Sequence, residues 1–219
     1  MVPLYRTIAL LASAMLFLAA CDKPKEGKTA AEATPENPFV IVAFGDSLTA
    51  GQGLPREQAF PARLEAALLA RGHRVKVVNA GVSGDTTAAG LARLDWSVGP
   101  DAQTVIVELG ANDMLRGVPP AETRKNLDAI LTRLEERKLP VLLVGMRAAT
   151  SLGGIFGNDF DSIYKDLADK HDVLLYPFFL DGVVMNDALN QGDGMHPNAQ
   201  GVEVIVKKIL PSVEKLIGK

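Results

Sequence analysis

Short apolar runs alternate with amphipathic segments along most of the chain. Runs with the length and composition of buried strands lie at Phe39–Phe44, Val75–Asn79, Thr104–Leu109, Val141–Met146 and Val173–Tyr176. Between these runs, apolar residues recur at the three- and four-residue spacing of a helix face. Buried strands that alternate with helices predict a parallel sheet covered on both faces, that is, an α/β fold built as a three-layer α/β/α sandwich.

The helical segments can be assigned inward faces from the same spacing. The predicted faces are Leu64, Leu68 and Leu69; Leu127, Ile130, Leu131 and Leu134; and Phe160, Ile163, Tyr164 and Leu167. A last helix is predicted after Pro197, with Asn198 as its N-cap. Its inward residues are Val202, Ile205 and Ile209. Ligands bind at the carboxyl ends of the strands in such sheets, so the residues that follow each strand are the first candidates for function.

A further apolar segment lies close to the start of the chain. It runs for 13 residues from Ile8 to Ala20, follows a single charged residue, Arg6, and ends in small side chains. A membrane-spanning helix needs about 20 apolar residues. The pattern therefore predicts a secretory signal peptide over residues 1–20 rather than an uncleaved membrane anchor.

Leu18-Ala19-Ala20-Cys21 resembles the lipobox of bacterial lipoproteins, which implies a mature chain that begins at a lipidated Cys21. Residues 22–38 contain no large apolar side chain, so residues 21–38 are expected to form a lipidated, flexible tether. We therefore expect a folded domain over residues 39–219. Its lipid would anchor it to a membrane of the bacterial cell envelope, and the domain would face the periplasm.

Composition and charge narrow the classes of function. The chain has 219 residues, which suits one domain, and its 23 Lys+Arg against 26 Asp+Glu give a formal charge of −3. This balance argues against a nucleic-acid partner, because phosphate binding depends on clustered basic residues. A single cysteine excludes an intramolecular disulfide framework and, with only three histidines, argues against a structural zinc site.

Polar residues follow three of the predicted strands. Ser47 stands in a Gly-Asp-Ser-Leu sequence after the first strand, Gly81 follows the second and Asn112 the third. Singly, each has an ordinary explanation, since serine is a common helix N-cap and glycine and asparagine are common in turns. Because the carboxyl ends of parallel strands meet at one edge, a hydroxyl, a glycine amide and a carboxamide are expected to converge there.

A serine nucleophile needs a base, and the chain offers three histidines. His73 and His171 each lie between a helix and the next strand, which places them at the amino edge of the sheet. His196 follows the fifth strand and precedes the last helix, so it lies on the same edge as Ser47. Asp193, three residues earlier, can reach the His196 ring and orient it, although each residue alone also fits a turn or a surface loop.

These residues resemble the four blocks of the SGNH hydrolases, also called the GDSL esterase/lipase family. The blocks in this chain are Gly-Asp-Ser-Leu at 45–48, Gly81, Gly110-x-Asn112-Asp113 and Asp193-x-x-His196. The likeness extends over Val40 to Leu210. The sequence of residues 79–87, Asn-Ala-Gly-Val-Ser-Gly-Asp-Thr-Thr, is similar to the arylesterase and lysophospholipase/thioesterase branch of the family.

The resemblance implies a flavodoxin-like parallel sheet of five strands and hydrolysis through an acyl-serine intermediate, with no metal and no organic cofactor. By this likeness Ser47 is the nucleophile and His196 the base, oriented by Asp193. The oxyanion hole would consist of the backbone amides of Ser47 and Gly81 and the side-chain amide of Asn112.

One segment departs from the branch. Relatives tend to carry a Pro-Pro-Asn-like sequence where this chain has Ala149–Gly154. We expect the glycine-rich Leu152–Gly157 to form a mobile loop at the catalytic edge. Its apolar residues Leu152, Ile155 and Phe156 are then candidates for binding the acyl group of the substrate.

The sequence thus predicts a serine esterase that acts on small carboxylic esters or thioesters, including aryl esters, acyl esters and lysophospholipids. Two alternatives remain open at this point. One is a carbohydrate O-acetylesterase of the same fold, and the other is a ligand-binding envelope lipoprotein without catalysis. The four intact blocks favour an enzyme, because a binding module has no need of a nucleophile, a base and oxyanion donors together.

Overall fold

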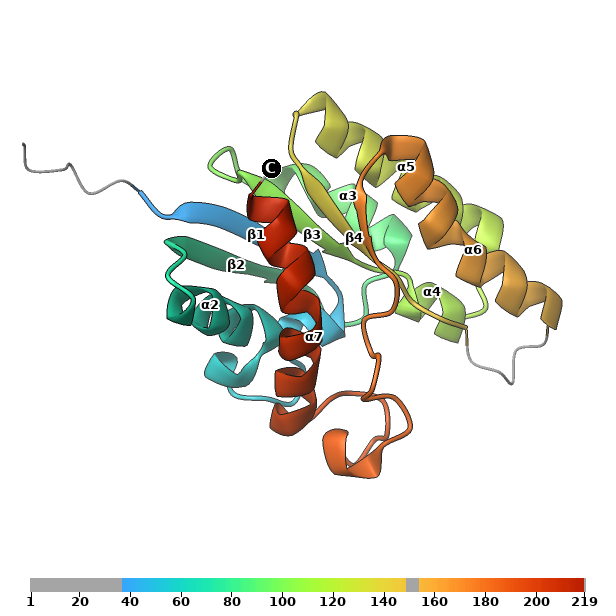
Figure 1. Ribbon diagram of the computed structural model, residues 1–219. Coiled ribbons are helices and arrows are strands. Elements are labelled where there is room, and N and C mark those ends of the chain that lie inside the picture. The colour runs from blue at the N-terminus through green and yellow to red at the C-terminus, as the bar shows by residue number, and fades with distance from the viewer. Residues whose placement is uncertain (1–36, 149–153, 219) are drawn as a thin grey trace, which may run out of the picture. The chain divides into compact units, whose positions relative to one another are not determined.

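A computed structural model describes residues 37–148 and 154–218. The predicted signal peptide, Cys21 and nearly all of the predicted tether lie outside these residues. Within the described ranges one parallel sheet has the strand order β2-β1-β3-β4-β5 (Figure 1). Its strands are β1 (Phe39–Gly45), β2 (Val75–Gly81), β3 (Thr104–Glu108), β4 (Val141–Val144) and β5 (Leu174–Tyr176). The prediction of a five-stranded parallel sheet is confirmed.

Helices cover both faces of this sheet. They are α1 (Ser47–Ala50), α2 (Phe60–Ala70), α3 (Thr87–Ser97), α4 (Ala111–Leu115), α5 (Pro120–Glu136), α6 (Gly154–His171) and α7 (Ala199–Ile217), with 3₁₀ turns at Arg56–Gln58 and Asp187–Leu189. α2 packs on α7 over one face, while α5 lies between α3 and α6 over the other (Figure 1). The three-layer α/β/α sandwich is therefore confirmed. None of the described helices is both long enough and apolar enough to cross a membrane.

Burial on both faces explains the unbroken apolar strands. All five residues of β3 and all four of β4 are buried, as are the last five of β1. The predicted helix faces are buried too, with one exception: Leu64 and Leu68 are buried, but Leu69 is 50% exposed. With 3.6 residues per turn, Leu69 points about 140° away from Leu64, so it leaves the inward face.

The start of α7 is held against the segment that precedes it. Asn198 caps the helix as predicted, its Oδ1 accepting the Gly201 N–H at 3.0 Å. Gly201 lets the helix approach closely, since a Cβ there would lie 2.2 Å from the Leu189 carbonyl oxygen. The segment that carries His196 is thus fixed by the helix that follows it.

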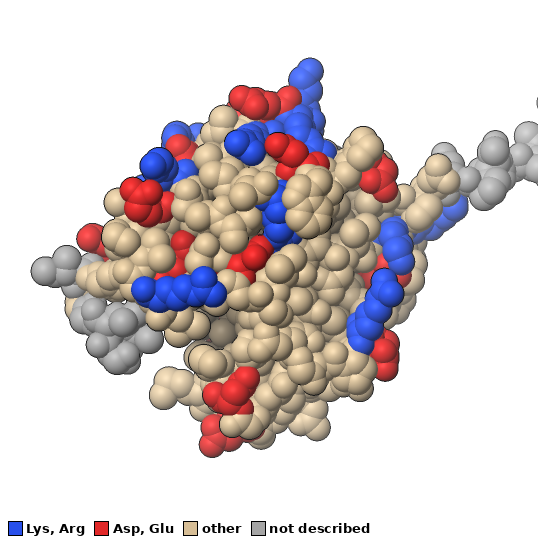
Figure 2. Space-filling model, turned by 180° about the vertical axis from the view of Figure 1, so that it is seen from behind, with Lys and Arg blue, Asp and Glu red and all other residues tan. Residues whose placement is uncertain are grey.

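The surface carries charges of both signs. On the face shown in Figure 2, lysine and arginine side chains are interspersed with aspartate and glutamate rather than gathered into one basic patch. The same face is hollowed in its lower half.

Candidate active site

The chain turns sharply where β1 ends and α1 begins. Asp46 forms the N-cap of α1, its Oδ1 accepting the Leu48 N–H at 3.0 Å. Ser47 is the first residue of the helix and not its cap, so a structural capping role does not explain this serine. Gly45 makes the tight turn possible, since a Cβ there would lie 2.2 Å from Thr49 Oγ1.

The structure brings Ser47, His196 and Asp193 into one line of hydrogen bonds. His196 Nε2 lies 3.0 Å from Ser47 Oγ, and His196 Nδ1 lies 2.6 Å from Asp193 Oδ2. Because a carboxylate only accepts, the neutral ring carries its hydrogen on Nδ1 and directs the lone pair of Nε2 at the Ser47 hydroxyl. Such an arrangement can take the hydroxyl proton as the oxygen attacks a carbonyl carbon.

Backbone hydrogen bonds hold Asp193 in place. Its Oδ1 accepts the N–H of His196 at 3.0 Å and that of Met195 at 2.9 Å. The His196 N–H, then the His196 ring and the Met195 N–H, hold the pKa of Asp193 down to about 2. The carboxylate is therefore charged at neutral pH and can orient the ring.

The loop around His196 is tied to the rest of the domain. Asn190 and Pro197 form an isolated antiparallel bridge, and the Gln191 N–H donates to the His196 carbonyl at 2.8 Å. The Gln191 side chain donates to the Gln52 carbonyl at 2.7 Å, just after α1. These contacts bring His196 and Ser47 together although they are 149 residues apart in the chain.

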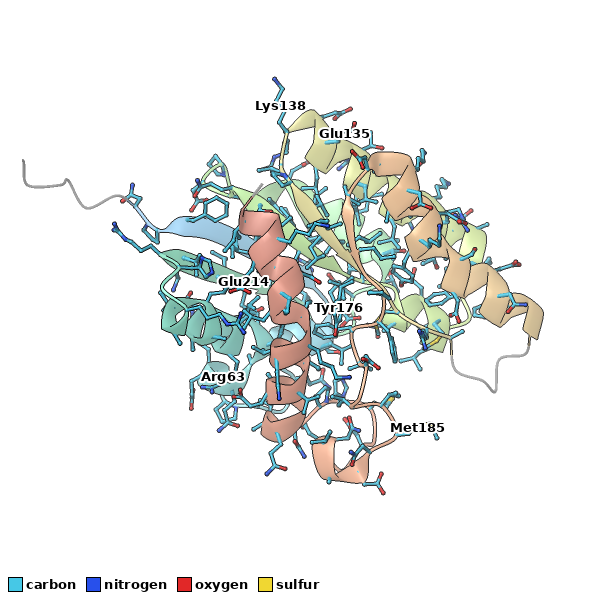
Figure 3. The ribbon with its side chains drawn as sticks, in the orientation of Figure 1. Arg63, Glu135, Lys138, Tyr176, Met185 and Glu214 are labelled. Carbon is cyan, nitrogen blue, oxygen red and sulfur yellow. The ribbon has the colours of Figure 1, made fainter. Side chains whose placement is uncertain are left out.

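The other two histidines lie elsewhere, as predicted. His73, before β2, contacts Glu214 of α7 at 3.2 Å, and His171 ends α6 just before β5. Figure 3 shows Glu135 and Lys138 at that amino edge and Met185, in the segment between β5 and His196, at the opposite end of the domain. Neither His73 nor His171 is placed to serve Ser47.

Asn112 also reaches this edge. Its Nδ2 donates to Asp46 Oδ2 at 3.0 Å, which links the segment after β3 to the turn that carries Ser47. The N-cap of α4 is Gly110, without a side-chain cap bond, so Asn112 is not a capping residue. A carboxamide nitrogen has two hydrogens, and the second remains available to a substrate oxygen.

The two glycines after β2 differ in what their backbone does. The Gly81 N–H, predicted as an oxyanion donor, is directed at its own strand and donates to Asn79 Oδ1 at 3.0 Å. Gly84 has a φ of +86° in the turn that follows, and its carbonyl accepts from Arg116 Nη2 at 2.7 Å. Gly84 is thus held to the end of α4, the helix that carries Asn112. The signal in the sequence was the Ser-Gly-Asp turn at residues 83–85.

Buried acids lie beneath the Ser47 turn. Burial raises the pKa of Asp46 to about 6, although the Leu48 N–H and the Asn112 amide oppose the shift. Burial, and then the charge of Asp46, raises the pKa of Glu108 well above its usual value, and Glu108 accepts from Thr49 Oγ1 at 2.8 Å. In the described part of the chain, no group of three or more histidine, cysteine or acidic side chains is arranged to hold a metal ion.

The predicted acyl-binding loop differs from what we expected. Leu152 lies outside the described residues, and residues 154–157 form the first turn of α6 instead of a loop. Ile155 lies within this turn. Phe156 is half-buried and stacks on Phe160 with ring centroids 6.2 Å apart, because the amphipathic pattern of α6 extends one turn further than expected. Contact with an acyl group remains a prediction for these residues.

Known proteins resemble this chain over most of its length. Residues 43–204 match the GDSL-like Lipase/Acylhydrolase family. An arylesterase of Vibrio mimicus is 36% identical over 178 residues, which cover 80% of this chain and 88% of the relative. Thioesterase 1/protease 1/lysophospholipase L1 of Escherichia coli K12 is 35% identical over 178 residues, covering 81% of this chain and 84% of the relative.

A solved structure shows the same likeness. The crystal structure of AlinE4, an SGNH-hydrolase family esterase, matches with a TM-score of 0.70 and 50% identity, covering 81% of this chain and 96% of that protein. The residues that match the family, 43–204, include the end of β1, strands β2 to β5 and the candidate site from Ser47 to His196. The chain therefore belongs to the GDSL-like lipase/acylhydrolase family, the SGNH hydrolases, and is a carboxylic ester hydrolase.

Proposed function

We propose that Ser47 attacks the ester carbonyl and carries the acyl group as a covalent intermediate. His196 Nε2 accepts the Ser47 proton during attack and then donates it to the departing alkoxide or thiolate. A water molecule, deprotonated by the same nitrogen, hydrolyses the acyl-serine and returns the enzyme to its starting state. The observation that carries this proposal is the continuous hydrogen-bonded line from Asp193 through His196 to Ser47.

Negative charge on the carbonyl oxygen develops only as the tetrahedral species forms, so donors aimed there accelerate the chemical step. We assign one donor to Asn112 Nδ2, which Asp46 holds beside the Ser47 turn, and a second to the Ser47 backbone N–H. For a third donor the Gly84 N–H fits better than that of Gly81, which is bonded to Asn79. A structure with a phosphonate on Ser47 would test this, since only the true donor lies within about 3.1 Å of the phosphoryl oxygen.

The substrates that this proposal favours are small aryl and acyl esters and thioesters, with lysophospholipids among them. The support is that relatives matching four-fifths of the chain are named arylesterase and thioesterase/lysophospholipase. A panel of p-nitrophenyl acyl esters, an acyl thioester, a lysophospholipid and acetylated sugars would define the range. Faster turnover of the acetylated sugars than of every aryl ester would replace this proposal with a carbohydrate O-acetylesterase.

Ser47→Ala tests the nucleophile. The variant is expected to stay folded and to lose hydrolysis of p-nitrophenyl acetate, because the hydroxyl is removed while the sheet is unchanged. A fluorophosphonate should label the wild-type protein at Ser47. Ser162→Ala, in α6 and away from the site, is the matched control and should keep both activity and labelling. Labelling at Ser83 or Ser162 in the wild type would contradict the assignment.

We also propose that the enzyme is an envelope lipoprotein, with residues 1–20 removed, Cys21 lipidated and residues 39–219 folded. The lipobox-like sequence supports the lipid, and 17 residues separate Cys21 from β1, a reach of at most about 60 Å. Cys21→Ala should lose radioactive palmitate and leave the membrane fraction, with unchanged activity of the released protein. Persistent label on the variant would contradict this proposal.

A further inference from the structure

Arg93 is a buried cation for which the proposed mechanism has no use. It comes from α3, and its side chain is 8% exposed. The guanidinium lies over the ring of Phe44, 4.3 Å from the ring centroid. A charge buried this deeply is costly unless its donors are satisfied, so its partners indicate what it is for.

Three of its four partners, two carbonyls and a carboxylate, lie at the catalytic edge. Arg93 Nη2 donates to the Gly45 carbonyl at 2.8 Å, and Nη1 donates to the Ala80 carbonyl at 2.9 Å. Arg93 Nε donates to Asp85 Oδ2 at 2.5 Å, and Nη1 also reaches Ser97 Oγ at 3.0 Å. Of the five guanidinium hydrogens, four therefore have partners.

These partners flank the groups that the proposed oxyanion hole needs. Gly45 lies two residues before Ser47. Ala80 and Asp85 lie on either side of residues 81–84, the segment that contains both glycine candidates for the backbone donor. One rigid, planar group thus holds the end of β1 and both ends of the segment after β2.

We propose that Arg93 is a positioning residue, which sets the distance between the Ser47 turn and residues 81–84 so that their backbone donors meet the same oxyanion. The inference rests on the proposed function and extends it. It holds whether Gly81 or Gly84 supplies the donor. Arginine suits the task because its fork presents donors in fixed directions, whereas a lysine ammonium is a single point on a flexible stem.

Arg93→Lys is the direct test, and Arg137→Lys is the matched control. Arg137 also donates to two backbone carbonyls, those of Val98 at 2.8 Å and Gly99 at 3.0 Å, but it does so from Nη2 alone and near the amino edge. A fluorophosphonate, allowed to react to completion, would count the competent sites in each variant, so that kcat is expressed per site. A fall in kcat per site then reports misplaced oxyanion donors, whereas a fall in the number of reactive sites reports a loss of folded protein.

For Arg93→Lys we expect kcat per site to fall about 10–100-fold, since a displacement near 1 Å can cost about 10²-fold, while KM changes little. Affinity for a trifluoromethyl ketone analogue of the tetrahedral species should fall by a similar factor. Arg137→Lys should keep both values. Wild-type kcat per site in Arg93→Lys, or an equal loss in Arg137→Lys, would overturn the inference.

A second variant covers the case in which Arg93→Lys does not fold. Asp85→Asn keeps an acceptor for Arg93 Nε but removes its charge, so we expect a smaller fall in kcat and in analogue affinity. Unchanged values for both would overturn the inference. Failure of the proposed function looks different, because the wild type would then carry no fluorophosphonate label on Ser47.

Discussion

Each edge of the sheet holds a histidine against acidic side chains, but the two rings have different partners. At the carboxyl edge, His196 meets Asp193 through one nitrogen and the Ser47 hydroxyl through the other. At the amino edge, His171 meets Asp128 at 2.7 Å and Glu135 at 3.3 Å. Both nitrogens of His171 therefore face carboxylates, and neither faces a hydroxyl that could act as a nucleophile.

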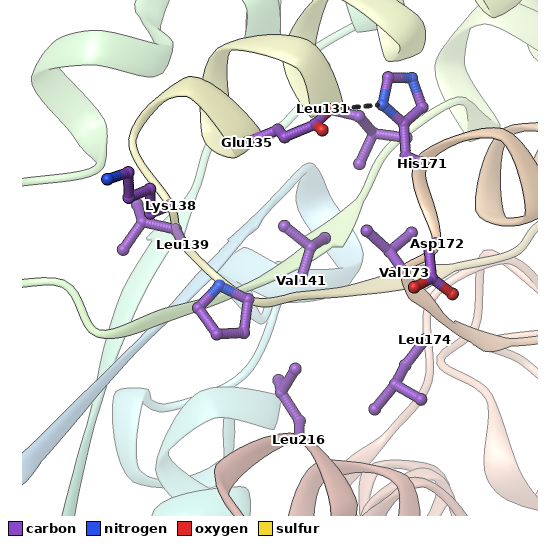
Figure 4. Close-up of a pocket in the computed structure, with 11 residues that line it drawn as sticks. Leu131, Glu135, Lys138, Leu139, Val141, His171, Asp172, Val173, Leu174 and Leu216 are labelled. Atoms are coloured by element: carbon purple, nitrogen blue, oxygen red, sulfur yellow. Dashed lines mark hydrogen bonds and ion pairs between the residues drawn. The ribbon is translucent and has the colours of Figure 1, made fainter. Parts of the chain in front are cut away.

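The presence of a pocket does not identify the catalytic edge of the sheet. A pocket of about 230 Å³ lies at the amino edge, where Figure 4 shows His171 bonded to Glu135. Its lining side chains include no serine, threonine or cysteine. The comparison teaches that a histidine can act as the base only when one ring nitrogen faces the nucleophile while the other is held by a carboxylate. It also teaches that a pocket without a nucleophile is not a hydrolytic site.

The largest expected effect comes from replacing each of the two histidines, separately, with glutamine. His196→Gln should lower kcat about 10²–10⁴-fold, the range for loss of a general base, with little change in melting temperature. His171→Gln should keep kcat and lose about 1–3 kcal/mol of stability, because acids of α5 lose a buried hydrogen-bonded partner. Turnover and thermal unfolding of both variants check this. A large fall in kcat for folded His171→Gln would break the comparison.

Asn112→Ala is expected to have the next largest effect. If Asn112 donates to the oxyanion, kcat should fall about 10²–10³-fold, the loss typical of one such donor. KM should change little, because the donor acts mainly in the transition state. A purely structural Asn112 predicts the reverse, namely a lower melting temperature with near-normal turnover. Steady-state kinetics together with thermal unfolding of this variant decide between the two.

Acids at the two edges should respond to pH with opposite signs. Burial raises the pKa of Asp46 from 3.8 to about 6. The contribution of Asp46 to the free energy of unfolding is therefore present at low pH and is lost as pH rises from about 4 to 6. The loss is of the order of 2–3 kcal/mol. Lys170 and then His171 lower the pKa of Asp128. Asp128 therefore adds to the free energy of unfolding above about pH 4, and this stabilisation is lost as pH falls below that value.

Unfolding titrations from pH 2 to 7 check these signs. The stability of Asp46→Asn relative to wild type should rise between about pH 4 and 6, whereas that of Asp128→Asn should fall as pH rises through its lower window. Equal slopes for the two variants would show that burial at the Ser47 turn does not set the behaviour of Asp46.

The sequence by itself determined the layers of the fold and the edge on which the chemistry lies. Runs such as Val141–Val144 identify strands because burial on both faces demands unbroken apolar residues. Chain order then places Ser47 and His196 at the carboxyl edge and His171 at the other. These inferences depend only on spacing along the chain and on the rule that parallel strands share a direction.

Tertiary structure alone decided which backbone donors are free and which buried charges hold them. In the sequence, Arg93 is an ordinary polar residue of a helical segment. In the folded chain its guanidinium donates to the Gly45 carbonyl, 48 positions away. The Gly81 amide, which the family resemblance implied as an oxyanion donor, is found bonded to Asn79 only in the folded chain. Local patterns report periodicity and polarity, whereas the direction of a hydrogen bond depends on atoms that only folding brings within 3 Å.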